Sequence, residues 1–204
     1  MDNNMFCFQC EQTAGCTGCT RSGVCGKTPV IANLQDKLTG AVIRLAEKNE
    51  MNKAKDALII KSLFTTITNV NFNETTITKL IDEVHAASGN ASDYDMNNVW
   101  YANEDIRSLK SLILFGVRGV AAYAYHAQVL GYEDAIVNAF FYEALRAVGS
   151  DMGMDELLPI VRKVGEVNLR CMALLDEANT KTYGNPVPTE VSLTVEKVPF
   201  IVIT

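Results

Sequence analysis

Five of the chain's six cysteines fall within nineteen positions near its beginning, in the stretch CFQCEQTAGCTGCTRSGVCGK. This stretch is rich in glycine and lacks the periodic apolar positions of a helix or a strand, so something other than a hydrophobic core must order it. A metal site would do so. The chain starts with no basic region and no long apolar run, which predicts a cytoplasmic protein. Clustered thiols in the reducing cytosol are typical of metal-binding or redox sites rather than of structural disulfides.

The spacing of these cysteines favours an iron–sulfur cluster. Cys7 and Cys10 form a C-x-x-C pair, which can place two thiolates on one metal or cluster across a tight turn. Cys19 follows after eight residues and Cys25 after five more. The glycines between them permit the positive φ angles that a chain needs in order to wrap a cluster.

Positive charge near the cysteines is consistent with an anionic cluster. A [4Fe–4S] cluster held by four thiolates carries a net negative charge. We expect Arg21, Lys27 and the N-terminus of a helix that starts at Pro29 to offset this charge, because a helix N-terminus is the positive end of the helix dipole.

Spacing alone leaves other interpretations open. A structural four-cysteine zinc site is the main alternative, although its cysteine pairs are usually separated by a longer stretch. Disulfides or free thiols are another, and a thioredoxin-type redox pair is disfavoured because no βαβ pattern surrounds it. Cys16 forms a second C-x-x-C with Cys19, so the spacing does not decide which four of the five cysteines bind.

The long middle of the chain has the periodicity of helices. Apolar residues recur every three or four positions, and the pattern predicts six helices, at residues 29–50, 53–70, 73–88, 105–131, 133–148 and 154–184. Thr28 is the expected N-cap and Pro29 the first helical residue. The predicted fold is therefore mainly α, a helical bundle domain preceded by a Cys-rich cluster-binding loop.

The tail has a different character. Residues 185–204 contain turn-forming residues, an alternating stretch and a final apolar run, FIVI, of the kind found in buried parallel strands. We expect this run to be the first strand of a truncated α/β domain, and the chain to be the N-terminal part of a longer protein. The predicted domains are residues 1–28, the Cys-rich loop; 29–184, the helical bundle; and 185–204, the linker and strand.

Charge excludes some classes of partner. The formal net charge is −6 and the sequence pI is about 5.0, with no cluster of lysine and arginine. Such a surface does not attract nucleic acid or an anionic membrane. The sequence contains no run of about 18 uncharged apolar residues, so no membrane span is predicted. Small molecules and proteins remain as partners.

Residues 6–36 carry a dense series of motifs: C-x-Q-C-E-Q-T-A, G-C-T, G-V-C-G-K and LQD. This series resembles the start of the hybrid cluster protein family, also called prismane proteins or hydroxylamine reductases. GNPVPTEVSLTV and PFIVIT look like that family's passage from its helical domain into its first α/β domain. The family's spacing falls on Cys7, Cys10, Cys19 and Cys25, and the resemblance implies that these four hold an N-terminal [4Fe–4S] cluster. Family members commonly have glycine where Cys16 stands, which makes Cys16 a surplus thiol with three open roles: bystander, substitute ligand or oxidation target.

The resemblance implies an electron relay in a reductase. The parent protein would reduce hydroxylamine with two electrons to ammonia and water, and also nitric oxide, at a hybrid iron–sulfur–oxygen cluster whose ligands lie beyond this chain. An external electron donor protein would supply the relay, and the 204 residues alone would be inactive. The alternative is a non-catalytic helical domain with a structural four-cysteine metal site. A third interpretation is a relative of the carbon monoxide dehydrogenases, which is disfavoured because the cluster motifs of those enzymes differ from the motifs in this chain.

The remaining notable residues have structural interpretations. His85 and His126 lie in predicted helices and are expected to be structural histidines rather than ligands. Cys171, on the apolar side of the last helix, is expected in the core. Gly116 and Gly119 predict a helix that another helix approaches closely.

Overall fold

The computed structural model describes residues 5–48, 50–188 and 201, and it confirms a mainly helical fold. The α-helices within these residues are α1 (Pro29–Lys48), α2 (Lys53–Thr65), α3 (Glu74–Ser88), α4 (Asn97–Trp100), α5 (Glu104–Val129), α6 (Ala135–Gly149) and α7 (Met154–Tyr183), preceded by the short 3-10 helix η1 (Ala14–Cys16). The predicted strand at the end of the chain lies outside the described residues apart from Ile201.

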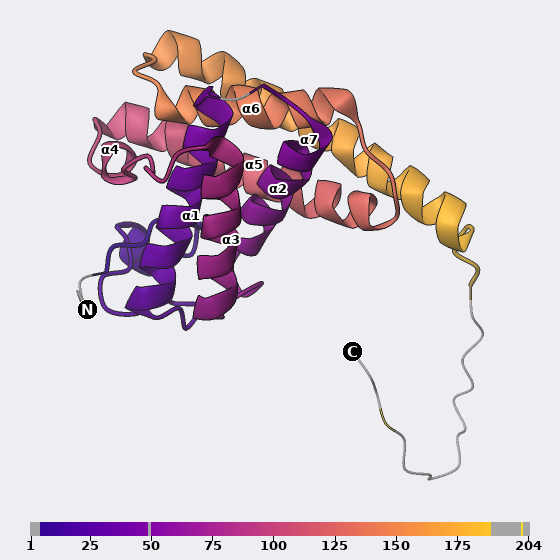
Figure 1. The fold of residues 1–204 in the computed structure, drawn as a ribbon, viewed down its shortest axis with the longest axis horizontal. Helices are drawn as coiled ribbons and strands as arrows, with labels where there is room; N and C mark the ends of the chain where they lie inside the picture. The colour runs from indigo at the N-terminus through magenta and orange to yellow at the C-terminus, as the bar shows by residue number, and fades with distance from the viewer. Residues whose placement is uncertain (1–4, 49, 189–200, 202–204) are drawn as a thin grey trace.

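The helices form two groups of three. Helices α1, α2 and α3 pack on one another, and so do α5, α6 and α7, which cross behind and above the first group in Figure 1. Contacts of α2 with α5 and of α1 with α6 join the groups. The cysteine loop lies beside the first half of α1, at one end of the molecule.

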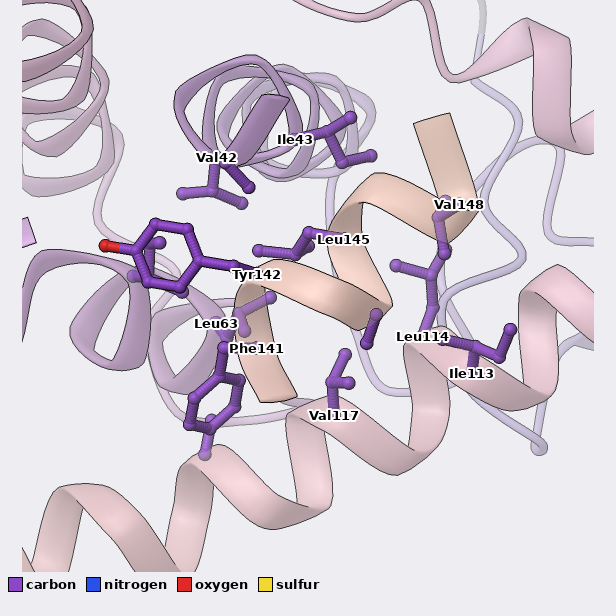
Figure 2. Packing of buried hydrophobic residues seen from close by; sticks show 14 of the residues in the cluster. Val42, Ile43, Leu63, Ile113, Leu114, Val117, Phe141, Tyr142, Leu145 and Val148 are labelled. Atoms are coloured by element: carbon purple, nitrogen blue, oxygen red, sulfur yellow. The ribbon is translucent and has the colours of Figure 1, made fainter. Parts of the chain in front are cut away.

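A continuous apolar core holds the two groups together. Figure 2 shows Val42 of α1, Leu63 of α2 and Val117 of α5 converging on Leu145 of α6, and all four are fully buried. Burial of such side chains from several helices is the main stabilising contribution to a bundle, at about 1.5–3 kcal/mol for each.

Side-chain caps set where several helices begin. The side-chain oxygens of Asn52, Asn73 and Asp134 accept hydrogen bonds from backbone N–H groups in the first turns of α2, α3 and α6. The Thr28 hydroxyl accepts from the backbone N–H of Ile31 at 3.3 Å, as expected for the N-cap of α1. Each such cap contributes about 1 kcal/mol because it satisfies a backbone donor that the helix leaves unpaired.

One predicted boundary is wrong. The second helix ends at Thr65 rather than near residue 70, because the Thr66 hydroxyl donates to the carbonyl of Leu63 at 2.8 Å and the chain then turns through Asn69 with a positive φ of 65°. Threonine side chains compete for backbone carbonyls in this way. The four-residue helix α4 was not predicted, since one turn is too short to show periodicity.

Of the two glycines predicted to allow a close approach of helices, only Gly116 does so. A Cβ atom at Gly116 would lie 2.2 Å from Cγ1 of Val164 on α7, whereas one at Gly119 would meet no atom within 4 Å. Glycine at 116 therefore lets α5 and α7 pack together. Of the helices in the described part of the chain, none has both the length and the apolarity to cross a membrane.

Candidate metal centre in the cysteine loop

Four of the five clustered cysteines face one cavity. Cys7, Cys10, Cys19 and Cys25 all line it, and Cys7 and Cys19 are buried while Cys10 and Cys25 are half-buried. Cys7 and Cys19 are held together by a short antiparallel bridge, in which each backbone N–H donates to the other's carbonyl at 2.9 Å. The structure thus places the four predicted ligands around one cavity, without grouping any three of them as a site for a metal ion.

Turns around these cysteines give the loop its shape. The Thr13 hydroxyl donates to the carbonyl of Cys7 at 3.0 Å, which closes the turn after the C-x-x-C pair. The N–H of Gly23 donates to the carbonyl of Lys27 at 2.8 Å, and the N–H of Gly26 donates to Gly23 at 2.9 Å. These bonds fold the chain tightly around Cys25, so local backbone pairing takes the place of a core here.

Aromatic rings wall off the side of the loop that faces the bundle. Phe6 and Phe8, on either side of Cys7 in the chain, pack against the Trp100 ring with centroid distances of 6.5 and 6.3 Å. Gly18 allows the Phe6 ring to approach, because Gly18 has a φ of 118° and a Cβ there would lie 2.4 Å from the ring. These ring contacts pack the loop onto α4.

Hydrogen-bond donors point at the sulfur of Cys19. The backbone N–H of Ala14 donates to Cys19 Sγ at 3.3 Å, and the Thr13 hydroxyl lies 3.7 Å from it. Burial alone would raise the pKa of Cys19, but the N–H groups of Ala14 and Val24, the contact with the Thr13 hydroxyl and the Lys27 charge outweigh burial and lower it. A lowered pKa favours the thiolate, which is the form that binds metals.

At Cys7 the effect of burial on the pKa is larger than the effect of the nearby positive charge. Burial raises the pKa of its thiol, and the nearby Lys27 charge opposes the shift without cancelling it. Ala32, one turn into α1, packs with Met5, Cys7 and Cys19 in a small buried cluster. The first turn of α1 therefore lies against the loop, as the sequence led us to expect.

Lys27 is the positive group that the structure places at the sulfurs. Its side chain is only 1% exposed, and its Nζ donates to Gln9 Oε1 at 2.7 Å and lies 3.9 Å from Cys7 Sγ. Arg21, the other basic residue expected there, is exposed to solvent, where water and salt screen its charge. Of the two predicted basic groups, Lys27 alone is buried against the loop.

A polar network that the sequence did not indicate lies behind Lys27, in which Gln9 and Trp100 are buried and Asp36 is half-buried. Gln9 Nε2 donates to Asp36 Oδ1 at 2.5 Å, and the indole N–H of Trp100 donates to Asp36 Oδ2 at 3.3 Å. Burial raises the pKa of Asp36 to about 6, although these hydrogen bonds and the charges of Arg118 and Lys27 work in the opposite direction. The carboxylate therefore stabilises the loop through its hydrogen bonds while remaining costly to ionise.

Arg118 connects this network to α5. Its guanidinium donates from Nη1 to the Gln9 carbonyl at 3.4 Å, from Nε to Thr66 at 3.0 Å and from Nη2 to Thr39 at 3.3 Å. The signal in the sequence was a lone arginine inside the apolar run LILFGVRGVAAYAY. A charged residue in such a run is normally paired when buried.

The other singled-out residues lie away from the cavity wall. Cys16 is exposed and has a φ of 57°, in the left-handed region. Cys171 is buried in the core, with its pKa raised to about 12 by burial. His85 pairs with Asp93 at 2.5 Å, and the His126 ring packs edge-on against Phe64. His85 and Cys171 thus have the structural roles expected of them, while His126 is exposed and lies outside the cavity.

The cavity has the donor set of a thiolate-bound centre. Four cysteine sulfurs, with the N–H of Ala14 directed at Cys19 and the Lys27 ammonium beside Cys7, fit the chemistry of an iron–sulfur cluster, and four cysteines can also hold zinc. Within residues 5–48, 50–188 and 201, no three histidine, cysteine, aspartate or glutamate side chains are grouped as a site for a metal ion.

Comparisons with known proteins give a consistent result. Residues 5–204 match the model of the Prismane/CO dehydrogenase family. Proteins named hydroxylamine reductase from Clostridium novyi, Methanocella arvoryzae and Acetivibrio thermocellus are 37%, 39% and 40% identical over 98% of this chain. The chain spans 44%, 45% and 43% of the lengths of these three relatives. With a family model that matches nearly its whole length, the chain belongs to the Prismane/CO dehydrogenase family.

Proposed function

We propose that this chain carries the [4Fe–4S] electron-relay site of a hydroxylamine reductase, with Cys7, Cys10, Cys19 and Cys25 as the cluster ligands. The observation that carries the proposal is that these four cysteines, and no other cysteine among the described residues, line one cavity. The names of the relatives support the reaction of the whole protein.

The whole protein would add two electrons and two protons to hydroxylamine and release ammonia and water. We propose nitric oxide reduction as a second activity of the whole protein. The reaction would take place at a hybrid iron–sulfur–oxygen cluster whose ligands lie outside these 204 residues. When bound, a [4Fe–4S] cluster accepts and passes on single electrons.

The residues of the loop have separate tasks in this proposal. The four thiolates hold the cluster, and the N–H of Ala14 and the Lys27 ammonium stabilise negative charge on the sulfurs. Phe6 and Phe8 hold the loop against Trp100 of the bundle. Cys25 is half-buried and its neighbour Val24 is 64% exposed. An electron donor protein, in the cytoplasm in this proposal, can therefore approach Cys25 closely. The net charge of −6 supports a protein partner rather than nucleic acid or a membrane.

The test is to count metal and sulfide on anaerobically purified protein and to record visible and EPR spectra before and after dithionite. We expect about four irons and four sulfides per chain and a visible band that bleaches on reduction. Cys10→Ser should lose the cluster, while Cys16→Gly, the matched control, should keep it. One zinc with no sulfide would refute the relay and leave a structural metal site. Turnover of hydroxylamine by the 204 residues alone would contradict the placement of the catalytic ligands.

A further inference from the structure

The position of Lys27 is unusual for a lysine. Lysine is among the residues least often fully buried, because its charge is strongly hydrated. Here the side chain is 1% exposed, and its Nζ contacts one amide oxygen, on Gln9, and one sulfur, on Cys7. A buried ammonium beside a thiol requires a compensating negative charge nearby, and the sulfur of Cys7 is the nearest atom able to carry it.

Gln9 links Lys27 to a second charge. Its Oε1 accepts from Lys27, and its Nε2 donates to the carboxylate of Asp36. The amide is thereby fixed in one orientation, and it holds the ammonium at the Cys7 side rather than at the carboxylate. Asp36 is influenced by the Lys27 and Arg118 charges, both of which oppose the rise in its pKa, so the three charged groups act on one another through the protein interior.

We propose that Lys27 is a positioning residue that raises the reduction potential of the cluster bound by these cysteines, with Asp36 as an opposing charge. This inference rests on the proposed function, since it requires the cluster. One electron from a reductant adds one negative charge at the site, and no bond of Lys27 forms or breaks. A fixed positive charge stabilises the reduced form more than the oxidised form, and does so strongly where water is excluded. A fixed negative charge has the opposite effect.

The test is a reductive titration of the iron-loaded chain at pH 8, followed by EPR, which reads the potential rather than turnover. Lys27→Met removes the charge and keeps a side chain of similar length. We expect the ratio of reduced to oxidised cluster at a fixed potential to fall at least tenfold, equivalent to 59 mV for a one-electron couple. Lys27→Arg should restore most of the ratio. Arg21→Met removes an exposed charge from the same loop and should change the ratio less than twofold.

The Asp36→Asn variant should change the ratio of reduced to oxidised cluster in the opposite direction. The residue lies on α1, outside the loop, and asparagine keeps an oxygen for the Gln9 amide. At pH 8 its carboxylate is ionised, so its removal should increase the ratio at least threefold. If Lys27→Met fails to retain iron and sulfide, Asp36→Asn still decides the question.

A change of less than twofold in Lys27→Met, or an unchanged or lower ratio in Asp36→Asn, would overturn the inference. A chain that binds no iron and sulfide fails at an earlier step and overturns the proposed function together with this inference. The two failures are distinguished by the metal count made before the titration.

Discussion

Asp36 should make the stability of the metal-free chain depend on pH in an unusual direction. Most structural carboxylates have lowered pKa values in the folded state and stabilise proteins above pH 4. Burial instead raises the pKa of Asp36 from 3.8 to about 6. The folded state therefore binds this proton more tightly than the unfolded state, and the associated stability is present below pH 4 and lost as the pH rises through 6.

The size of the effect follows from the same shift. A difference of about 2 pKa units at about 1.4 kcal/mol per unit corresponds to about 3 kcal/mol. Asp36→Asn removes the titration. The free energy of unfolding of the wild type should therefore fall by about 2.5 kcal/mol relative to this variant between pH 4 and pH 8, because the unfolded chain is already partly ionised at pH 4. Any constant cost, such as a weaker hydrogen bond from Trp100, shifts both ends equally and leaves the change intact.

Urea unfolding followed by circular dichroism at pH 4, 5, 6, 7 and 8 measures this difference. Asp82→Asn, at an exposed position of α3, controls for the general effect of removing one negative charge. A difference between the wild type and Asp36→Asn that stays constant across this range would refute the reasoning. It would mean that the carboxylate is better hydrated than its position under Trp100 implies.

Three further predictions concern the loop and the helix packing. Cys16→Gly should raise the free energy of unfolding by about 1 kcal/mol, since glycine adopts the φ of 57° without strain, and a urea titration checks this. Gly116→Ala should lower it by about 1–3 kcal/mol in the same assay, because the new Cβ meets Val164 on α7; an unchanged midpoint would contradict the close approach. Removing bound metal with a chelator should leave the helical circular dichroism signal nearly intact, because the core lies outside the loop; a large loss would contradict this independence.

Local patterns were informative about the helices and about the loop. The apolar spacing from Ile31 to Leu45 depends on neighbours three and four positions away, and so predicts a helix without knowledge of the rest of the fold. The cysteines of the loop are close in the chain, so their spacing already limits how they can meet. The end of the second helix was missed because the Thr66 hydroxyl, a single side-chain interaction, outweighs weak propensities at a helix end.

The hydrogen-bond network behind the loop could not be predicted from local sequence patterns. Arg118 meets Gln9 across 109 positions of the chain, and Trp100 meets Asp36 across 64. Such contacts depend on how α1, α4 and α5 pack, which no short motif records. The charge of Arg21 was overestimated for the same reason, since only the packing decides which of two basic residues in the loop points inward.

The unequal burial of the four cysteines has a consequence for how the centre is assembled. Cys7 and Cys19 are joined by backbone hydrogen bonds and packed against α1. Folding alone therefore fixes the positions of these two cysteines. Cys10 and Cys25 retain exposed surface. If the chain binds the proposed cluster, iron and sulfide would therefore meet an inner wall that folding has already formed and an accessible outer edge, and the cluster would be inserted after folding without reopening the helices.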